Sequence, residues 1–122
     1  MTVTVTIKRA AAAGFWGLIL VIGFLSLQPV ENLPDVQIWD KIQHLVAYGA
    51  LAFCGLVAYP RRLWQVIGFT VLYGLAIEFA QGLVPGRVPS FGDVIANTLG
   101  GMMVLVAFRV GLLRRLAQDK SA

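Results

Sequence analysis

The chain has 122 residues, of which 58% are hydrophobic and only 13% are charged. A soluble domain carries about 25% charged residues, and a chain with so few would turn large apolar patches toward water, which monomeric soluble proteins rarely do. The length allows one domain, and the composition excludes an ordinary soluble globule. The single cysteine, Cys54, excludes an internal disulfide framework.

Four apolar runs are long enough to cross a bilayer, which takes about 17 to 25 residues of helix. They cover about residues 10–27, 42–59, 63–84 and 91–113. Each run must be helical, because a segment alone in lipid has to satisfy its own backbone hydrogen bonds. The sequence therefore predicts an all-α integral membrane protein, a compact bundle of four transmembrane helices that forms one domain over residues 1–122. Residues 2–6 alternate Thr and Val like a strand without a partner, and we expect a short, poorly ordered tail there.

Basic residues predict the orientation, because Lys and Arg are retained on the cytoplasmic side. With the amino terminus inside, the outer loops hold only Lys41 and Arg87, and Arg109 can extend from the fourth span to the inner face. The basic residues then on the cytoplasmic side are Lys8, Arg9, Arg61, Arg62, Arg114, Arg115 and Lys120. This pattern predicts that both termini are cytoplasmic. It also explains the net charge of +4 without nucleic acid as a partner.

Polar residues inside the spans gather at one depth, on the outer side of the predicted membrane. Their spacings of three and four place side chains on one face of a helix. An unpaired charge at the centre of a span costs roughly 2.5–3.5 kcal/mol, so Glu78 and Asp93 should face other helices or a wet cavity. The sequence predicts one polar pocket that opens to the outside. The residues expected around it are Asp40, Lys41, His44, Tyr48, Glu78, Gln81, Arg87, Asp93 and Asn97, with Ser90 in the adjoining loop.

The side chains of this pocket suit the recognition and chemistry of phosphate. Lys41 and Arg87 offer donors to an anion, Arg as a planar fork and Lys as a point charge. An imidazole and carboxylates supply general acid and base groups. The candidate catalytic residues are therefore His44, Asp40, Glu78 and Asp93, and the candidate substrate-binding residues are Lys41, Tyr48, Gln81, Arg87, Ser90 and Asn97. One histidine among dispersed acids has no recognised metal-ligand spacing, so we predict neither a metal nor another cofactor, with a carboxylate-bound divalent cation as the alternative.

Several of these residues also have a purely structural interpretation. Asp40 suits the N-cap of the second helix. Ser90 suits the N-cap of the fourth, and Asp93, three residues later, would complete a capping box. Gly100 and Gly101 are typical of close helix contacts in membranes.

The polar residues match a known pattern. The ordered set Asp40-Lys41-x-x-His44-x-x-x-Tyr48, Glu78-x-x-Gln81 and Arg87-x-x-Ser90-x-x-Asp93-x-x-x-Asn97-x-x-Gly100 resembles the VanZ-like family of small bacterial membrane proteins. The resemblance covers about half of the chain, residues 40–101, and every motif position is present. It implies the bacterial cytoplasmic membrane and a link to resistance against the glycopeptide teicoplanin. It does not supply a reaction.

Three hypotheses for function follow from these residues. The first is recognition of an anionic or phosphate-bearing membrane lipid or lipid-linked envelope component, with phosphoester hydrolysis or headgroup transfer as its enzymatic version. The second is non-catalytic binding of an envelope component or partner membrane protein that alters access of the antibiotic. The third is that the polar residues only hold the helices together. A homodimer that enlarges the pocket is compatible with each.

Overall fold

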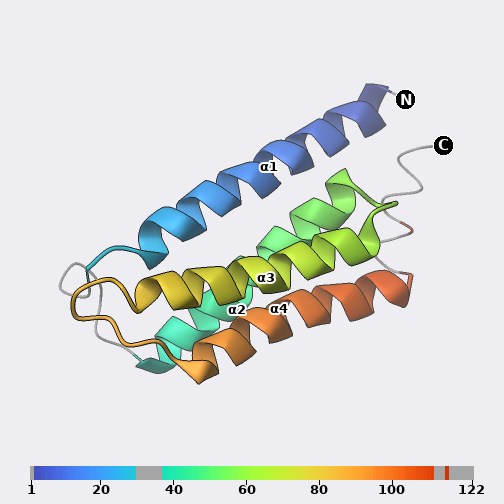
Figure 1. Ribbon diagram of the computed structural model, residues 1–122. Helices are drawn as coiled ribbons and strands as arrows, with labels where there is room; N and C mark the ends of the chain where they lie inside the picture. The colour runs from blue at the N-terminus through green and yellow to red at the C-terminus, as the bar shows by residue number, and fades with distance from the viewer. Residues whose placement is uncertain (1, 30–36, 112–114, 116–122) are drawn as a thin grey trace.

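The computed structural model describes residues 2–29, 37–111 and 115; of residues 2, 3 and 37–40 it describes only the backbone. The described part consists of four α-helices and contains no strand. They are α1 (Thr2–Ser26), α2 (Gln37–Ala58), α3 (Leu63–Gln81) and α4 (Phe91–Arg109) (Figure 1). All four are long and apolar enough to cross a membrane, which confirms the predicted four-span, all-helical fold.

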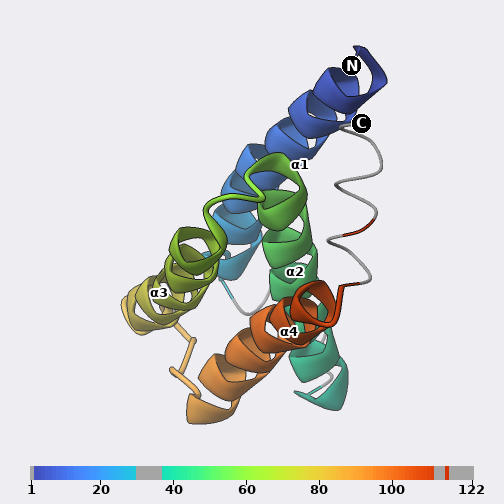
Figure 2. The same cartoon turned by 90° about the vertical axis from the view of Figure 1, so that its right-hand side faces the viewer.

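Successive helices run in opposite directions, as short connections require (Figure 1). One end of the bundle, which we call the polar end, is where α1 and α3 finish and α2 and α4 begin. The other, the basic end, is where α1 and α3 begin and α2 and α4 finish. The central helix is α2, which contacts all three others (Figure 2).

Four helix boundaries differ from the sequence-based expectation by more than one residue. The second helix begins at Gln37 rather than at residue 42, so Asp40 lies inside α2 and is not its N-cap. The tail expected at residues 2–6 is wrong, because α1 begins at Thr2. An alternating Thr and Val segment without a partner strand satisfies its backbone only within a helix. At the polar end α3 stops at Gln81 rather than at Val84. Directly after Gln81, Gly82 and the turn to Gly86 (φ 82°) redirect the chain. The fourth helix stops at Arg109, before Gly111 with its φ of 100°, a left-handed conformation typical of helix ends; residues 112–114 lie outside the described part.

The interior is built from two apolar clusters with α2 between them. Toward the basic end, Leu56 of α2 packs among residues of α3 and α4, including Ile67 and Phe108. On the other side, Leu51 packs with Phe15 and Ile22 of α1. Large apolar side chains also cover the outside of the helices, as expected where lipid is the solvent: Leu20 is 74% exposed and Phe79 is 78% exposed.

The closest approach between helices lies where α4 crosses α2. A methyl group on Gly100 would overlap the carbonyl oxygen of Leu45 and would lie 2.9 Å from Gly49 N. Only glycine therefore allows the two backbones to meet at this point. The two helices run in the same direction, so this contact also fixes which residues face one another along the rest of the interface.

We expect Gly100→Ala to destabilise the bundle by about 2–3 kcal/mol, the upper part of the range for overpacked cores, because the atoms in the way belong to backbone. Gly68→Ala is the matched control, since a methyl group there meets nothing within 4 Å. Unfolding in mixed detergent micelles measures both free energies. Equal stability of the two variants would show that α2 and α4 are not held at this contact.

Candidate functional site

The first elements of the site lie across the interface of α2 and α4. Lys41 Nζ is 3.1 Å from Asp93 Oδ1; the Lys41 side chain is half exposed and that of Asp93 is 11% exposed. The ammonium group of Lys41 on α2 thus neutralises the carboxylate of Asp93 on α4, which would be costly to leave unpaired in lipid.

One helical turn further on, His44 contacts the same face of α4. His44 Nδ1 lies 2.9 Å from Asn97 Oδ1. Because an amide oxygen only accepts, Nδ1 must carry the hydrogen in this arrangement. The other ring nitrogen, Nε2, lies 3.9 Å from Asp93 Oδ2, which is beyond direct hydrogen-bond distance. Asp93 therefore lies between the side chains of Lys41 and His44.

The beginning of α4 is tied to α3 through a buried carboxylate. Ser90 is the N-cap of α4, and its Oγ accepts from Asp93 N at 3.4 Å, which confirms the predicted capping role. The predicted capping box is not formed, because Ser90 N donates to Glu78 Oε1 at 2.5 Å and the Asp93 side chain pairs with Lys41. Glu78 is only 4% exposed. Its negative charge is favourable beside the positive end of the α4 dipole.

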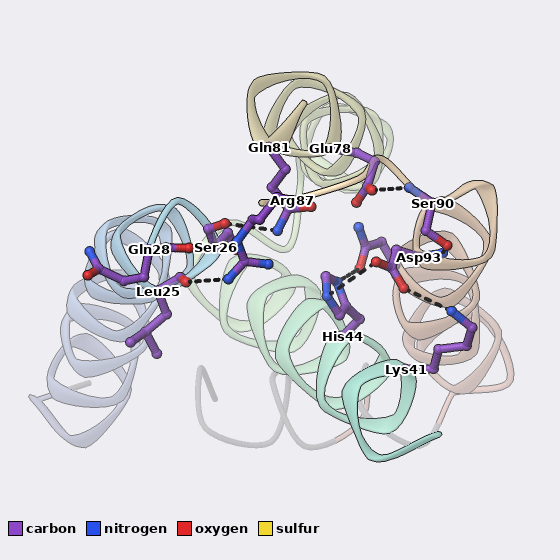
Figure 3. A network of polar contacts seen from close by, with 11 residues as sticks. Leu25, Ser26, Gln28, Lys41, His44, Glu78, Gln81, Arg87, Ser90 and Asp93 are labelled. Atoms are coloured by element: carbon purple, nitrogen blue, oxygen red, sulfur yellow. Dashed lines mark hydrogen bonds and ion pairs between the residues drawn. The ribbon is translucent and has the colours of Figure 1, made fainter. Parts of the chain in front are cut away.

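The end of α1 is held by donors that follow it in the sequence (Figure 3). Gln81 Nε2 donates to the carbonyl oxygen of Ser26 at 2.9 Å. Arg87 Nε donates to the Gln28 carbonyl at 2.7 Å, and Arg87 Nη2 to that of Leu25 at 3.4 Å. The last carbonyls of a helix have no partner within it, and a cation suits that negative end. Arg87 and Gln81 therefore complete α1 and lock it to α3 and its following loop.

The sequence analysis did not predict that the carbonyls of Leu25, Ser26 and Gln28 accept these hydrogen bonds. It also did not predict one donor, the hydroxyl group of Tyr73. Main-chain carbonyls have no residue-specific signal, and Tyr73, whose hydroxyl donates to the Ile19 carbonyl, lies in an apolar run. The usable signal was indirect: a transmembrane helix that ends near residue 27 leaves carbonyls that need donors from elsewhere.

A cavity of about 330 Å³ lies between α1, α2 and the polar end of α3. Its apolar wall comes mainly from α1, and its polar wall from α2, α3 and Arg87. The lining residues are Leu18, Val21, Ile22, Leu25, Ser26, Gln43, His44, Ala47, Tyr48, Gln81 and Arg87. Such a division between apolar and polar walls suits an amphiphile.

Two buried polar atoms near this cavity have no hydrogen-bond partner among the described residues. They are the Tyr48 hydroxyl and Asn97 Nδ2, in side chains whose residues are 1% and 3% exposed. The two side chains lie side by side against Gly74, where a methyl group would be 3.2 Å from Tyr48 Cε2 and 3.3 Å from Asn97 Nδ2. A buried donor without a partner is costly, so a bound oxygen atom would be favourable here.

The structure gathers the predicted site residues at the polar end but divides them into groups. Lys41, His44, Asp93 and Asn97 form one connected group between α2 and α4, and Ser90 links Glu78 to it, because Ser90 N donates to Glu78 and Ser90 Oγ accepts from Asp93 N. Lys41 does not line the cavity, whereas Arg87, Gln81 and Tyr48 do. The side chain of Asp40 lies outside the described residues. Within the described part, no three His, Cys, Asp or Glu side chains cluster closely enough to hold a metal ion.

We expect Gln81→Glu to loosen the end of α1. A carboxylate cannot donate to the Ser26 carbonyl, and the loss of a buried partner costs about 1–3 kcal/mol. Amide hydrogen exchange over residues 19–26 at pH 8 should accelerate about 5- to 100-fold. Gln65→Glu, at an exposed position of the same helix, is the control and should leave this exchange unchanged. Unaltered exchange in Gln81→Glu would mean that α1 is docked by its apolar face alone.

Comparison with known proteins agrees with this architecture. No curated protein and no solved structure matches the chain. A family model described as VanZ/LLP1 matches residues 3–114, nearly the whole chain. The protein therefore belongs to the VanZ-like family, as its polar motifs indicated.

Proposed function

We propose that the polar end of this VanZ-like membrane protein binds an anionic or phosphate-bearing lipid or lipid-linked envelope component. The observation that supports this most directly is the divided wall of the 330 Å³ cavity. Leu18, Ile22 and Ala47 offer an apolar surface, while Arg87 and His44 offer polar groups. A membrane lipid has the same division between acyl chain and headgroup. The volume lies at the lower end of the range for ligand pockets, about 300–1,000 Å³.

The depth of the cavity supports the same ligand. Leu18 and Ser26 both line it and are eight residues apart on α1. At about 1.5 Å per residue this corresponds to ~12 Å along the helix axis. The cavity thus reaches from the level of the helix ends, where headgroups lie, into the region of the acyl chains. It has room for a headgroup and the first methylene groups of one chain.

Arg87 is the proposed partner of the negative charge. Its planar guanidinium suits phosphate oxygens, and it is already oriented by the carbonyls of Gln28 and Leu25. Lys41 has a different part in this proposal, because its ammonium group is paired with Asp93. It maintains the charge balance next to His44 instead of contacting the ligand.

Chemical processing of the ligand is a second candidate function, supported by the position of His44. Its ring lines the cavity, and Nε2 faces Asp93 at 3.9 Å. In phosphoester hydrolysis or headgroup transfer, Nε2 would take the proton of the attacking water or alcohol as its oxygen bonds to phosphorus. The P–O bond to the leaving group breaks, and the imidazolium, held beside Asp93, returns the proton to the leaving oxygen. Asp40 and Glu78 are further acid or base candidates. The non-catalytic alternative is that a retained envelope ligand or partner alters access of a glycopeptide such as teicoplanin.

We also propose that the protein lies in the bacterial cytoplasmic membrane with both termini inside and the polar end in the outer leaflet. Lys8, Arg9, Arg61 and Arg62 all fall near the basic end, as retained cytoplasmic residues should. The Arg109 guanidinium lies 5.8 Å from the centre of the Trp64 ring at that same end, a pairing suited to an interface.

A cavity-filling substitution tests lipid binding. Ala47→Phe should reduce the phospholipid that co-purifies in mild detergent at least about 5-fold, because the ring adds volume at an apolar position of the cavity wall. Val46→Phe, at a neighbouring position that is 60% exposed, is the matched control and should retain the lipid. Mass spectrometry of extracts from the purified proteins measures both. Equal lipid content in the two variants would contradict the proposal.

The same assay separates binding from chemistry. If His44 is a general base, vesicle lipids incubated with the protein should be converted, and His44→Gln should abolish the conversion while retaining bound lipid. If wild type returns every lipid unchanged, the non-catalytic version stands.

Single cysteines test the orientation. In a Cys54→Ala background, a cysteine at position 88, where Val88 is 83% exposed, should react with a membrane-impermeant maleimide in intact cells. A cysteine at the exposed position 61 should react only after permeabilisation. The reverse labelling pattern would place the polar end in the inner leaflet.

A further inference from the structure

One of the residues that line the cavity has a buried hydroxyl group without a hydrogen-bond partner. Tyr48 belongs to the cavity wall, and the residue is only 1% exposed. Its hydroxyl group makes no hydrogen bond within the described part of the chain. A buried O–H that has lost water without gaining an acceptor is costly. This position therefore favours a ligand atom that can accept a hydrogen bond.

A second unpaired donor lies beside Tyr48. The Asn97 side chain contacts His44 through Oδ1, at 2.9 Å, and its Nδ2 has no partner among the described residues. A methyl group on Gly74 would lie 3.2 Å from Tyr48 Cε2 and 3.3 Å from Asn97 Nδ2, so the two side chains meet at this glycine. Neither donor is hydrogen-bonded to the carboxylate of Glu78. Because an amide N–H only donates, this part of the interior is short of acceptors rather than of donors.

The Tyr48 side chain lies further from the polar end than Arg87 does. Arg87 Nη2 donates to the Leu25 carbonyl, at the end of α1. The Tyr48 ring is 6.4 Å from the ring of Tyr73, whose hydroxyl donates to the Ile19 carbonyl of the same helix. Ile19 precedes Leu25 by six residues, which corresponds to about 9 Å along a helix axis. The cavity thus combines a cation near the end of α1 with a neutral donor one to two turns below it.

Membrane lipids differ chemically at this depth. In an acyl glycerophospholipid, the glycerol unit separates the phosphate from the ester groups, so the carbonyl oxygens lie just below the headgroup. An ether-linked lipid or an isoprenoid phosphate has no carbonyl oxygen at that level. A carbonyl oxygen accepts hydrogen bonds and brings no donor of its own. It therefore matches a position at which donors are left without acceptors.

From this arrangement we infer that the cavity binds the ester carbonyl of an acyl glycerolipid, with the Tyr48 hydroxyl group as the donor. The inference rests on the proposed function and narrows its ligand to ester-linked glycerolipids, in preference to ether-linked or isoprenoid ones. Arg87 faces the phosphate, and Leu18 and Ile22 cover the methylene groups that follow the ester. The recognition of the carbonyl uses no charge, so it adds specificity for the lipid backbone to whatever selects the headgroup.

The test compares two phosphatidylglycerols with the same headgroup and the same chain lengths, one with ester-linked and one with ether-linked chains. Delipidated protein in detergent is titrated with each lipid, and binding is followed by native mass spectrometry. The ester lipid should bind about 5-fold more tightly, the effect expected of one neutral hydrogen bond.

Two results would contradict the inference in different ways. Equal binding of the two lipids, or tighter binding of the ether lipid, would mean that water rather than the ligand satisfies the hydroxyl group. Lipid binding itself would then stand. If neither lipid binds, or if Ala47→Phe weakens the binding of neither, the proposed function fails and the inference fails with it.

Tyr48→Phe assigns the preference to the hydroxyl group. The ring is retained, so binding of the ether lipid should change less than about 2-fold, whereas the ester lipid should lose about 5-fold. Tyr59→Phe is the matched control and should keep the full preference. The Tyr59 hydroxyl accepts from Trp16 Nε1 at 3.1 Å toward the basic end, and Tyr59 lies outside the residues that line the cavity. An ester preference that persists in Tyr48→Phe would overturn the role given to this hydroxyl group.

Discussion

The contact between the backbones of α2 and α4 at Gly100 determines the rest of the polar end. Helices are rigid on the scale of a few turns, so one fixed contact sets the register of the whole interface. Because both helices run in the same direction, the contact with Leu45 and Gly49 places the preceding turns of α2 opposite the preceding turns of α4. Those turns hold the pair that joins His44 to Asn97 at 2.9 Å. A larger residue at position 100 would displace the polar groups that lie beyond it.

The polar network is a poor means of stabilising a bundle in lipid. Hydrogen bonds between transmembrane helices contribute on average about 0.6 kcal/mol each, while a charge at the bilayer centre costs several times as much. Glu78 is 4% exposed and Asp93 is 8% exposed, so both are removed from water. Apolar side chains at these positions would hold the helices together at lower cost. This imbalance favours a role in binding over the purely structural interpretation of the cluster.

The sequence predicted the four spans and the level at which polar residues gather, because run length and helical spacing are properties of the chain alone. It predicted the N-cap at Ser90 for the same reason. It could not predict that Arg87 and Gln81 donate to α1, since any residue offers a carbonyl and only the packed bundle decides which one is within reach. It also could not show that Lys41 pairs with Asp93 outside the cavity, because that pairing depends on the register between two helices far apart in sequence.

Different helices determine the shape of the cavity and the charge beside it. Near the polar end α1 contributes apolar side chains and main-chain carbonyls, and its charged residues, Lys8 and Arg9, lie toward its other end. Among the described residues, the charges at this end belong to α2, α3, α4 and Arg87. A substitution at Leu18 or Ile22 therefore alters the apolar wall of the cavity without altering the charge beside it. A change at Arg87 alters both, because the same guanidinium group holds α1 in place and faces the cavity.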